Sequence, residues 1–400
     1  MRRILVALLA LGLVGIVGSA QTLTVLGPWA SGGEMELFIP VLEAAEAELG
    51  IDIEYQTYRA EDLAPVLTAQ FAAGQAPGDV IFMWPWFVAD NATHALDLTA
   101  LINPAQFSGG ALDPVTVDGH IYGAAYTAKV KPGFWYRKSF FEANNLSVPT
   151  TWEEFNQLLD DIAGIDGVVA PIAAGDGVGW PLSDLAEHIL VAFGGPQLHK
   201  ELTSCACISC GNWKSVFRAI IVDWFVYWIE MGYFGEPTEW TQAVQLWWDG
   251  DYPLYFMGSW ITGMDPVTDK TDIGVFPIPG TQGFVQAVDY AFVPAYTEYP
   301  DEAQALIQYL ATAGQEIQIA QGGHLATYSL IDTSLYPPES KAAGDILVGK
   351  VVLTDLDDGI GGDFQTTFWD QLKLLLVAPE RADEVIDTII EAYDAECGCE

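Results

Sequence analysis

Tryptophan residues stand beside glycine, proline or a polar residue at several expected strand ends of this chain. They are Trp29 in GPWASGG, Trp84 and Trp86 in MWPWF, Trp180 in GWPLSD, Trp240 in PTEWT, Trp260 in GSWITG and Trp369 in TTFWDQL. Carboxylates lie near these positions in the sequence: Asp79, Asp184, Glu239 and Asp289. An indole offers a flat apolar face that matches the C–H face of a pyranose ring, and a carboxylate can accept sugar hydroxyl protons. Large aromatic side chains also fill cores, so no single tryptophan indicates a carbohydrate site. The tryptophans and carboxylates taken together do.

Trp260 is the most informative of these tryptophans. It follows the apolar run LYFM at residues 254–257, which predicts a strand that ends at Gly258 and Ser259. Trp260 is then either a buried plug of the core or a stacking platform on a cleft wall. We expect the cleft wall, because ligands in open α/β folds bind beyond the carboxyl ends of the strands.

Signatures of catalysis are weak in this sequence. The chain has no G-x-S-x-G, H-E-x-x-H or phosphate-loop motif. Its histidines are scattered without a helical pair at metal-ligand spacing: His94, His120, His188, His199 and His324. We therefore predict no catalytic residue, no cofactor and no metal site. The 54 acidic residues leave one alternative open, the carboxylate pair of a glycoside hydrolase.

The elements that must position these side chains alternate between strands and helices. LTVLG predicts a strand, the spacing after Glu34 predicts a helix, and IDIEYQTY alternates like a second strand. A further helix and the strand GDVIFMWP follow, and Thr151 and Glu154 form a predicted capping box. The apolar stripe of NWKSVFRAIIVDWFVYWIEMG predicts a helix that faces the core. The class is α/β, and without a Ser- or Pro-rich linker two lobes should be joined by several crossings.

The N-terminal segment indicates export, and export in turn bears on how the cysteines are interpreted. Arg2 and Arg3, an apolar run and a small-residue end at Ala20 are typical of a cleaved signal peptide over residues 1–20. The cysteines number five: Cys205, Cys207, Cys210, Cys397 and Cys399. In an exported protein they predict disulfides with one thiol left over, and C-x-C-x-x-C lacks the paired spacing of a zinc site.

The charge balance limits the partners. Lys and Arg number 15 against 54 Asp and Glu, for a formal net charge of −39. Such a surface repels phosphate backbones, so nucleic acid is not an expected partner. The acidity itself fits a solubility device or an adaptation to salt or acid equally well.

One long stretch resembles a known family. GYFGEPTEWTQAVQLWWDGDYPLYFMGSWITG is similar to the corresponding region of extracellular solute-binding proteins of carbohydrate importers driven by ATP-binding-cassette (ABC) transporters, the maltose- and glucoside-binding-protein-like family. GDVIFMWPWF, WPLSDLAEHIL, IGVFPIPG and VDYAFVPAY agree in kind and in order. This chain differs from the family at LTSCACISCGNWKS, where relatives have a polar turn.

The resemblance implies a periplasmic-binding-protein fold with a ligand cleft between two lobes. It places the first lobe at residues 21–127 plus 290–328 and the second at 128–289 plus 329–400, joined by a hinge of several crossings. It implies ligand contacts at Trp29, Glu34, Asp79, Trp84, Tyr126, Lys129, Trp180, Asp184, Trp260, Asp289, Tyr290, His324 and Trp369.

The function so implied is that of a non-enzymatic, monomeric binding protein outside the cytoplasm, periplasmic or extracellular. It would capture a mono- or oligosaccharide and deliver it to the permease subunits of the importer. Two alternatives remain: a secreted glycoside hydrolase, and the same fold with a polyamine or another cation as its ligand.

Overall fold

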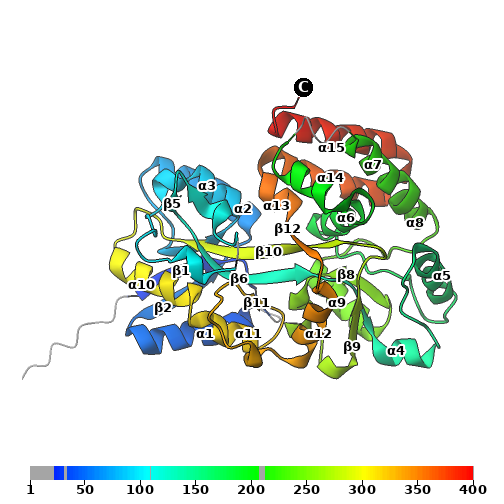
Figure 1. Ribbon diagram of the computed structural model, residues 1–400, viewed down its shortest axis with the longest axis horizontal. Coiled ribbons are helices and arrows are strands. Elements are labelled where there is room, and N and C mark those ends of the chain that lie inside the picture. The colour runs from blue at the N-terminus through cyan, green and yellow to red at the C-terminus, as the bar shows by residue number, and fades with distance from the viewer. Residues whose placement is uncertain (1–21, 31–33, 109, 207–211, 400) are drawn as a thin grey trace, which may run out of the picture.

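The computed structural model of the chain has two lobes, and two long strands run from one into the other (Figure 1). The structure describes residues 22–30, 34–108, 110–206 and 212–399. The predicted signal peptide at residues 1–20 lies outside the described residues. Within the described residues, no helix combines the length and the apolar character that a membrane span needs.

The first lobe is built on the parallel strands that the alternation at the start of the chain predicts. Strand β1 pairs in parallel with β2 and β3, and helices pack around this sheet. These elements are β1 (Thr22–Gly27), α1 (Glu34–Leu49), β2 (Asp52–Thr57), α2 (Ala60–Ala72), β3 (Val80–Met83), α3 (Pro85–Asp90), α10 (Pro300–Ala311) and α11 (Gly314–Ala320). A short hairpin of β4 (Thr116–Val117) and β5 (His120–Ile121) completes the lobe.

The connection between the lobes consists of several segments. β6 (Ala124–Lys131) and β10 (Gly283–Phe292) are antiparallel neighbours, and β10 also pairs antiparallel with β3 in the first lobe. β11 (Leu325–Ala326) pairs with β6, and β12 (Val351–Thr354) pairs in parallel with the start of β10. The two-lobed fold with a connection of several crossings is therefore as expected.

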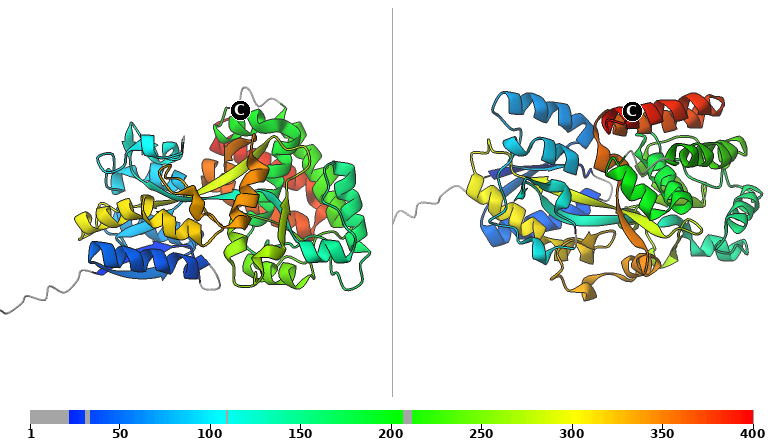
Figure 2. Two further views of the ribbon diagram at one scale, coloured as in Figure 1. Left: turned by 60° about the horizontal axis from the view of Figure 1, so that its bottom comes forward. Right: turned by 45° about the horizontal axis from the view of Figure 1, so that its top comes forward.

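The second lobe differs from the first in its sheet. Strand β7 lies between β8 and β9 and is antiparallel to both. The remaining elements of this lobe are β7 (Gly133–Arg137), α4 (Lys138–Ala143), α5 (Trp152–Ala163), α6 (Trp180–Thr203), α7 (Trp213–Ile220), α8 (Tyr227–Glu230), α9 (Trp240–Asp249), β8 (Leu254–Met257), β9 (Ile273–Phe276), α12 (Pro338–Leu347), α13 (Leu356–Ile360), α14 (Gly362–Val377) and α15 (Ala382–Glu396). Figure 2 shows the C-terminal helices packed on the second lobe from two further sides.

Local sequence signals account for several of these helices. The capping box is present: Thr151 accepts from the Glu154 backbone N–H, and the Glu154 carboxylate reaches back to the Thr151 N–H. The predicted core-facing helix is interrupted by one π-helical segment (Ile221–Val226) between α7 and α8, and its stripe is buried at Phe217, Ile220 and Trp228. Spacing thus predicts the buried face even where the hydrogen-bond pattern changes.

Buried side chains form separate cores in the two lobes. The largest cluster of the first lobe runs up to Tyr126 and resumes at Tyr290, and that of the second lobe begins at Phe134. The lobe boundaries at 127/128 and 289/290 therefore fall inside β6 and β10. The exact boundaries remain a prediction.

The two cysteine clusters meet in space. Cys205, after α6, is joined by a disulfide to Cys397, after α15, across 192 residues of sequence. Cys207 and Cys210 lie outside the described residues. The disulfide ties the C-terminal helix to the helical layer of the second lobe.

Candidate ligand-binding cleft

A cleft with a volume of about 470 Å³ lies between the lobes. Its first-lobe wall comes from the segments after β1 and β3 and from the start of α2, and β6 and β10 contribute residues where they cross. Its second-lobe wall comes from the starts of α6 and α9, the turn after β8, and α13 and α14. Parallel strands end at one edge of a sheet, which is why the segments after β1 and β3 reach the same wall.

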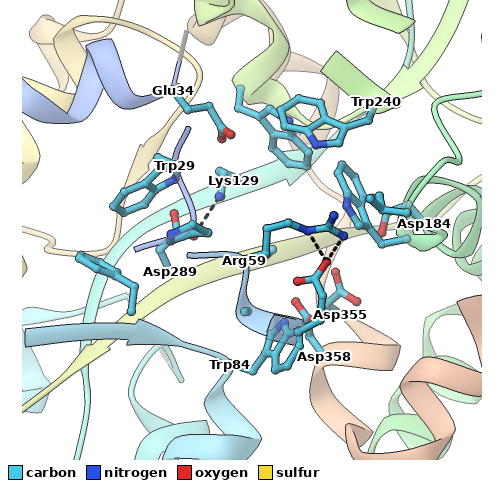
Figure 3. Close-up of a pocket in the computed structure, with 18 of the residues that line it drawn as sticks. Trp29, Glu34, Arg59, Trp84, Lys129, Asp184, Trp240, Asp289, Asp355 and Asp358 are labelled. Carbon is cyan, nitrogen blue, oxygen red and sulfur yellow. Dashed lines mark hydrogen bonds and ion pairs between the residues drawn. The ribbon is translucent and has the colours of Figure 1, made fainter. Parts of the chain in front are cut away.

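Most of the predicted site residues lie on this cleft. They are Trp29, Glu34, Trp84, Lys129, Trp180, Asp184, Trp260, Asp289, Tyr290 and Trp369. Figure 3 shows how several of these side chains converge from both lobes. Their contact with a ligand stays a prediction.

Asp79 does not line the cleft. It precedes β3, whereas the cleft lies beyond the other end of that strand. Its carboxylate accepts hydrogen bonds from the Thr24 backbone N–H (2.8 Å) and the Thr297 hydroxyl (2.6 Å). Asp79 therefore holds β1 and the segment after β10 together, at the edge of the sheet away from the cleft.

Tyr126 and His324 do not line the cleft either. Tyr126 is 1% exposed, and its hydroxyl donates to Gln318 Oε1 (3.0 Å), while its ring packs edge-on against Trp29. The imidazole of His324 lies 2.8 Å from the Thr127 hydroxyl, and burial holds its pKa well below the ordinary value. These hydrogen bonds thus tie β6, through Tyr126 and Thr127, to Gln318 on α11 and to His324.

Trp260 is both buried in a core and part of the cleft wall, the two placements that the sequence offered as alternatives. Its side chain is 6% exposed and packs in a core cluster, yet it forms part of the cleft wall. A Cβ at Gly258 would lie 1.7 Å from the Trp260 ring, so only glycine allows the chain to turn so closely under the indole. The ring centroid lies 5.8 Å from that of Trp180.

Lys129 and Asp289 form an ion pair on the two crossing strands. Lys129 Nζ lies 2.9 Å from Asp289 Oδ1, and 5.4 Å and 6.0 Å from the ring centroids of Trp260 and Trp29. The register of β10 against β6 shifts between Val288 and Tyr290, so Asp289 sits at a bulge that redirects its side chain. The ammonium thus lies near one indole from each lobe, at cation–π distance.

Glu34, at the start of α1, faces this pair. Burial raises the pKa of Glu34 to about 7, and the charge of Lys129 opposes that rise. Around neutral pH its carboxyl group can therefore either donate or accept a hydrogen bond.

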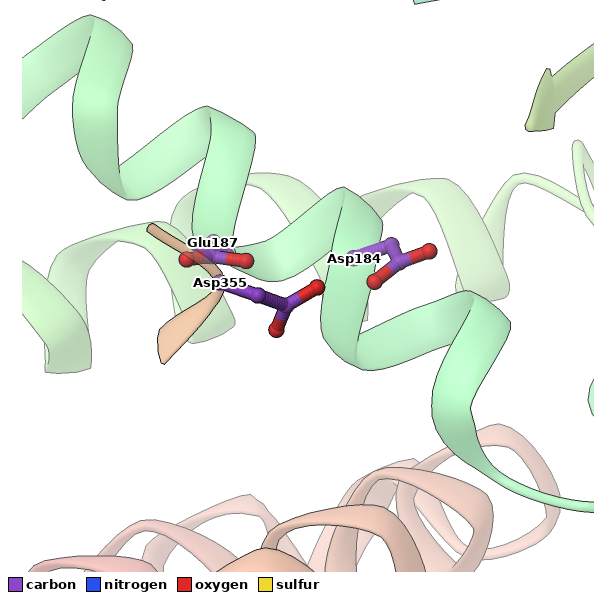
Figure 4. A group of neighbouring side chains, drawn as sticks. All are labelled: Asp184, Glu187 and Asp355. Carbon is purple, nitrogen blue, oxygen red and sulfur yellow. The ribbon is translucent and has the colours of Figure 1, made fainter. Parts of the chain in front are cut away.

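Lys131 is a feature of the cleft that the sequence did not single out. Its ammonium bridges the carboxylates of Asp184, on α6, and Asp355, after β12, and all three side chains are buried. Figure 4 shows Asp184 and Asp355 with the neighbouring Glu187, whose Oε1 accepts from the Leu356 N–H (2.7 Å). The spacing of these carboxylates would suit a metal ion, but Lys131 already supplies a cation there.

Asp357 and Asp358 were also missed, although the acidic run TDLDDG could have indicated them. Asp357 accepts hydrogen bonds from the Ser183 hydroxyl (2.6 Å) and Trp369 Nε1 (2.5 Å). Burial, together with the charge of Asp355, raises the pKa of both carboxyls well above the ordinary value. Each of them therefore keeps its proton to a higher pH than an exposed carboxyl does, and a cation that approaches would oppose this rise in pKa.

Aromatic faces from both lobes meet beside this acidic group. Trp84 of the first lobe stacks on Trp86 (5.6 Å between centroids) and lies 6.4 Å from Trp369 of the second lobe. Gly361 brings the backbone after α13 against Trp86, where a Cβ would come within 2.5 Å of the ring.

Two further residues line the cleft but were not in the predicted set. They are Arg59, which pairs with Glu61 at 2.6 Å, and Trp240.

Comparison with known proteins identifies the family. The family model described as bacterial extracellular solute-binding protein matches residues 29–317. An uncharacterized ABC transporter extracellular-binding protein of Pyrococcus horikoshii, PH1039, is 48% identical over 93% of this chain and 88% of its own length.

This chain is a member of the extracellular solute-binding protein family. A more distant relative, the osmoprotective compounds-binding protein GgtB of Synechocystis, is 26% identical, with 87% of each chain covered. A solved chitin oligosaccharide binding protein has the same fold, with a TM-score of 0.80, 21% identity, and coverage of 95% of this chain and 100% of its own. As a family member, the chain is the solute-binding component of an ABC transporter.

Proposed function

We propose that this protein is the substrate-binding component of an ABC-type sugar importer, which captures a mono- or oligosaccharide and delivers it to the permease. The observation that carries the proposal is the cleft itself, where indoles from both lobes stand among carboxylates. Solved structures with the same fold are complexes with raffinose, with maltose and with stachyose.

Each part of the cleft suits one part of a sugar. The faces of Trp84, Trp260 and Trp369 offer apolar contact to pyranose rings. Carboxylates accept from sugar hydroxyls, and protonated carboxyls donate to them. A cleft that hydrogen-bonds particular hydroxyls rejects a ligand that lacks them, so the polar groups set specificity.

Closure of the lobes would complete the site. Ligand contacts from both walls favour the closed arrangement, and a ligand shifts this equilibrium only by its differential affinity for it. Rigid lobes joined by β6, β10 and β12 should close about a narrow hinge. Small-angle scattering should give a smaller radius of gyration with saturating ligand, and an unchanged radius with tight binding would contradict closure.

We further propose that residues 1–20 direct export and are removed, and that the mature protein acts as a monomer at the outer side of the membrane. Mass spectrometry of the secreted protein should find a new N-terminus near residue 21. An intact Met1 in the secreted protein would contradict this assignment.

Calorimetry with a panel of neutral mono- and oligosaccharides tests the function. Stoichiometric binding without new products supports it, and Trp84→Ala should weaken binding by about 1–3 kcal/mol. Trp152→Ala, an aromatic change outside the cleft lining, is the matched control. Turnover of an oligosaccharide would instead indicate a glycoside hydrolase, and binding of spermidine but of no sugar would indicate a cation carrier.

A further inference from the structure

The charged side chains of the cleft are unbalanced. Its lining holds the acidic residues Glu34, Glu61, Asp184, Glu239, Asp289, Asp355, Asp357 and Asp358, and the basic residues Arg59, Lys129 and Lys131. Each of these basic side chains is already paired with a carboxylate: Arg59 with Glu61, Lys129 with Asp289, and Lys131 with Asp184 and Asp355.

This balance bears on the charge of the ligand. In the described lining, an anionic sugar such as a uronic acid or a sugar phosphate meets no unpaired cation. To bind such an anion, the cleft would have to share or break one of these ion pairs, and the pairs of Lys131 with Asp184 and Asp355 are buried. A buried anion without a cationic partner carries a large desolvation cost.

A cation, by contrast, finds a suitable group of acceptors. One oxygen from each of Asp355, Asp357 and Asp358 lies within 4.8 Å of the others. Since an ammonium hydrogen bond is about 2.7–3.2 Å long, one nitrogen can lie within reach of all three. Lys131 makes the same kind of bridge on the neighbouring side of Asp355.

Lys131 is the one basic side chain that forms an ion pair with this group within the described structure. Asp355 is 3% exposed, and its Oδ1 has no hydrogen-bond partner within the described structure. Asp357 accepts from the neutral Ser183 hydroxyl and Trp369 N–H, and Asp358 accepts from the Gln365 amide (2.7 Å). Lys131 thus supplies one positive charge to Asp184 and Asp355, whereas the donors to Asp357 and Asp358 named above are neutral.

Aromatic faces supply a second, independent feature that favours a cation. Trp369 donates to Asp357, and Trp84 lies beside it from the first lobe. The negative face of an indole attracts an ammonium within about 6 Å. The cleft already uses this chemistry for its own Lys129, which lies 5.4 Å from the centroid of Trp260.

We propose that the saccharide bound in this cleft carries a protonated amino group, held by Asp355, Asp357 and Asp358 beside Trp84 and Trp369. This rests on the proposed function and names the ligand as an amino sugar. Burial raises the pKa of Asp357 and Asp358, and an ammonium beside them lowers it again, so binding favours the loss of a proton from this group. Binding should therefore release a proton, which a neutral sugar does not do.

Calorimetry on matched ligands tests this. The probes are glucose, glucosamine and glucuronate, and cellobiose with its diamino counterpart, the glucosamine disaccharide. We expect the amine to bind about tenfold to hundredfold more tightly than the hydroxyl counterpart, and the acid more weakly than either. Titrations in phosphate and in Tris buffer at pH 7 should differ in binding enthalpy for the amine alone, because the protons that it releases bind to the buffer.

A pair of variants locates the effect. Asp358→Asn should reduce the amine-to-hydroxyl affinity ratio towards one and reduce the proton release, to which Asp357 still contributes. Asp370→Asn, on α14 and 70% exposed, should leave the ratio unchanged.

The outcomes separate the two proposals. If neutral sugars bind as tightly as their amines, the amino-sugar proposal is wrong and sugar binding stands. If no saccharide binds, the proposed function fails as well. If calcium chloride alone raises the melting temperature and Asp358→Asn abolishes that rise, the acidic group is a metal site and the amino-sugar proposal is wrong.

Discussion

Replacing Lys131 with methionine should destabilise the second lobe through charge and not through packing. The ammonium of Lys131 lies between Asp184 and Asp355, and each of the three residues is less than 5% exposed. Methionine keeps most of the volume of the side chain but leaves two buried carboxylates without their counter-ion. Breaking a buried ion pair by removing one partner costs about 3–5 kcal/mol.

That cost converts into a measurable shift in melting temperature. Unfolding entropy is about 2.1 cal/mol/K per residue, so for a chain of this size one degree corresponds to about 0.8 kcal/mol. We expect Lys131→Met to lower the melting temperature by about 4–6 °C at pH 8. In the variant the folded state binds protons more readily than the unfolded state, so the loss should shrink as the pH falls.

Thermal unfolding followed by circular dichroism at pH 8 and at pH 5 is the assay. Lys200→Met, an exposed lysine on α6, is the control for the loss of a positive charge. Adding Asp184→Asn and Asp355→Asn to Lys131→Met should restore part of the stability, because the uncompensated charges are gone. A shift below 1 °C for Lys131→Met, or no recovery in the triple variant, would refute the reasoning.

Further predictions concern the cleft and the disulfide. Trp260→Ala should cost about 3–5 kcal/mol of unfolding free energy and also weaken sugar binding, because the indole packs in a core and faces the cleft. Unfolding by denaturant with calorimetry on one sample checks both, and full stability with normal binding would contradict the placement. The pKa of Glu34 is raised from 4.5 to about 7, so the folded chain holds a proton that the unfolded chain releases in that range. The loss of melting temperature from pH 4.5 to 8 should therefore be smaller in Glu34→Gln than in the wild type, and equal losses would be inconsistent with a buried Glu34 carboxyl. The double variant Cys205→Ala/Cys397→Ala should lose less than the about 2–5 kcal/mol that removing a native disulfide usually costs, because Cys399, close by in the sequence, is also disulfide-bonded; urea unfolding under non-reducing conditions measures this, and a larger loss would contradict it.

Periodicity and local motifs were enough to predict much of the architecture. The strand before Trp29, the helix from Glu34 and the capping box at Thr151 depend on interactions within a few residues, and each is where the sequence places it. The placement of Trp84 and Trp260 on the cleft follows from the same local logic, since each comes directly after a strand. Asp79, in contrast, lies before its strand, and its distance from the cleft could have been inferred from that order.

The sequence by itself determined the elements, their order and the tryptophans that follow the strands, because these depend on spacing along the chain. Only the tertiary structure decided which charges meet. Lys131 and Asp355 are separated by 224 residues and Cys205 and Cys397 by 192, and no periodicity relates positions so far apart. The partners of a buried charge are set by which elements pack together, and packing brings α6, β6 and the segment after β12 to one side of the cleft. The pairing of Lys131 with Asp184, and the group of Asp357 and Asp358 beside it, therefore came from the fold.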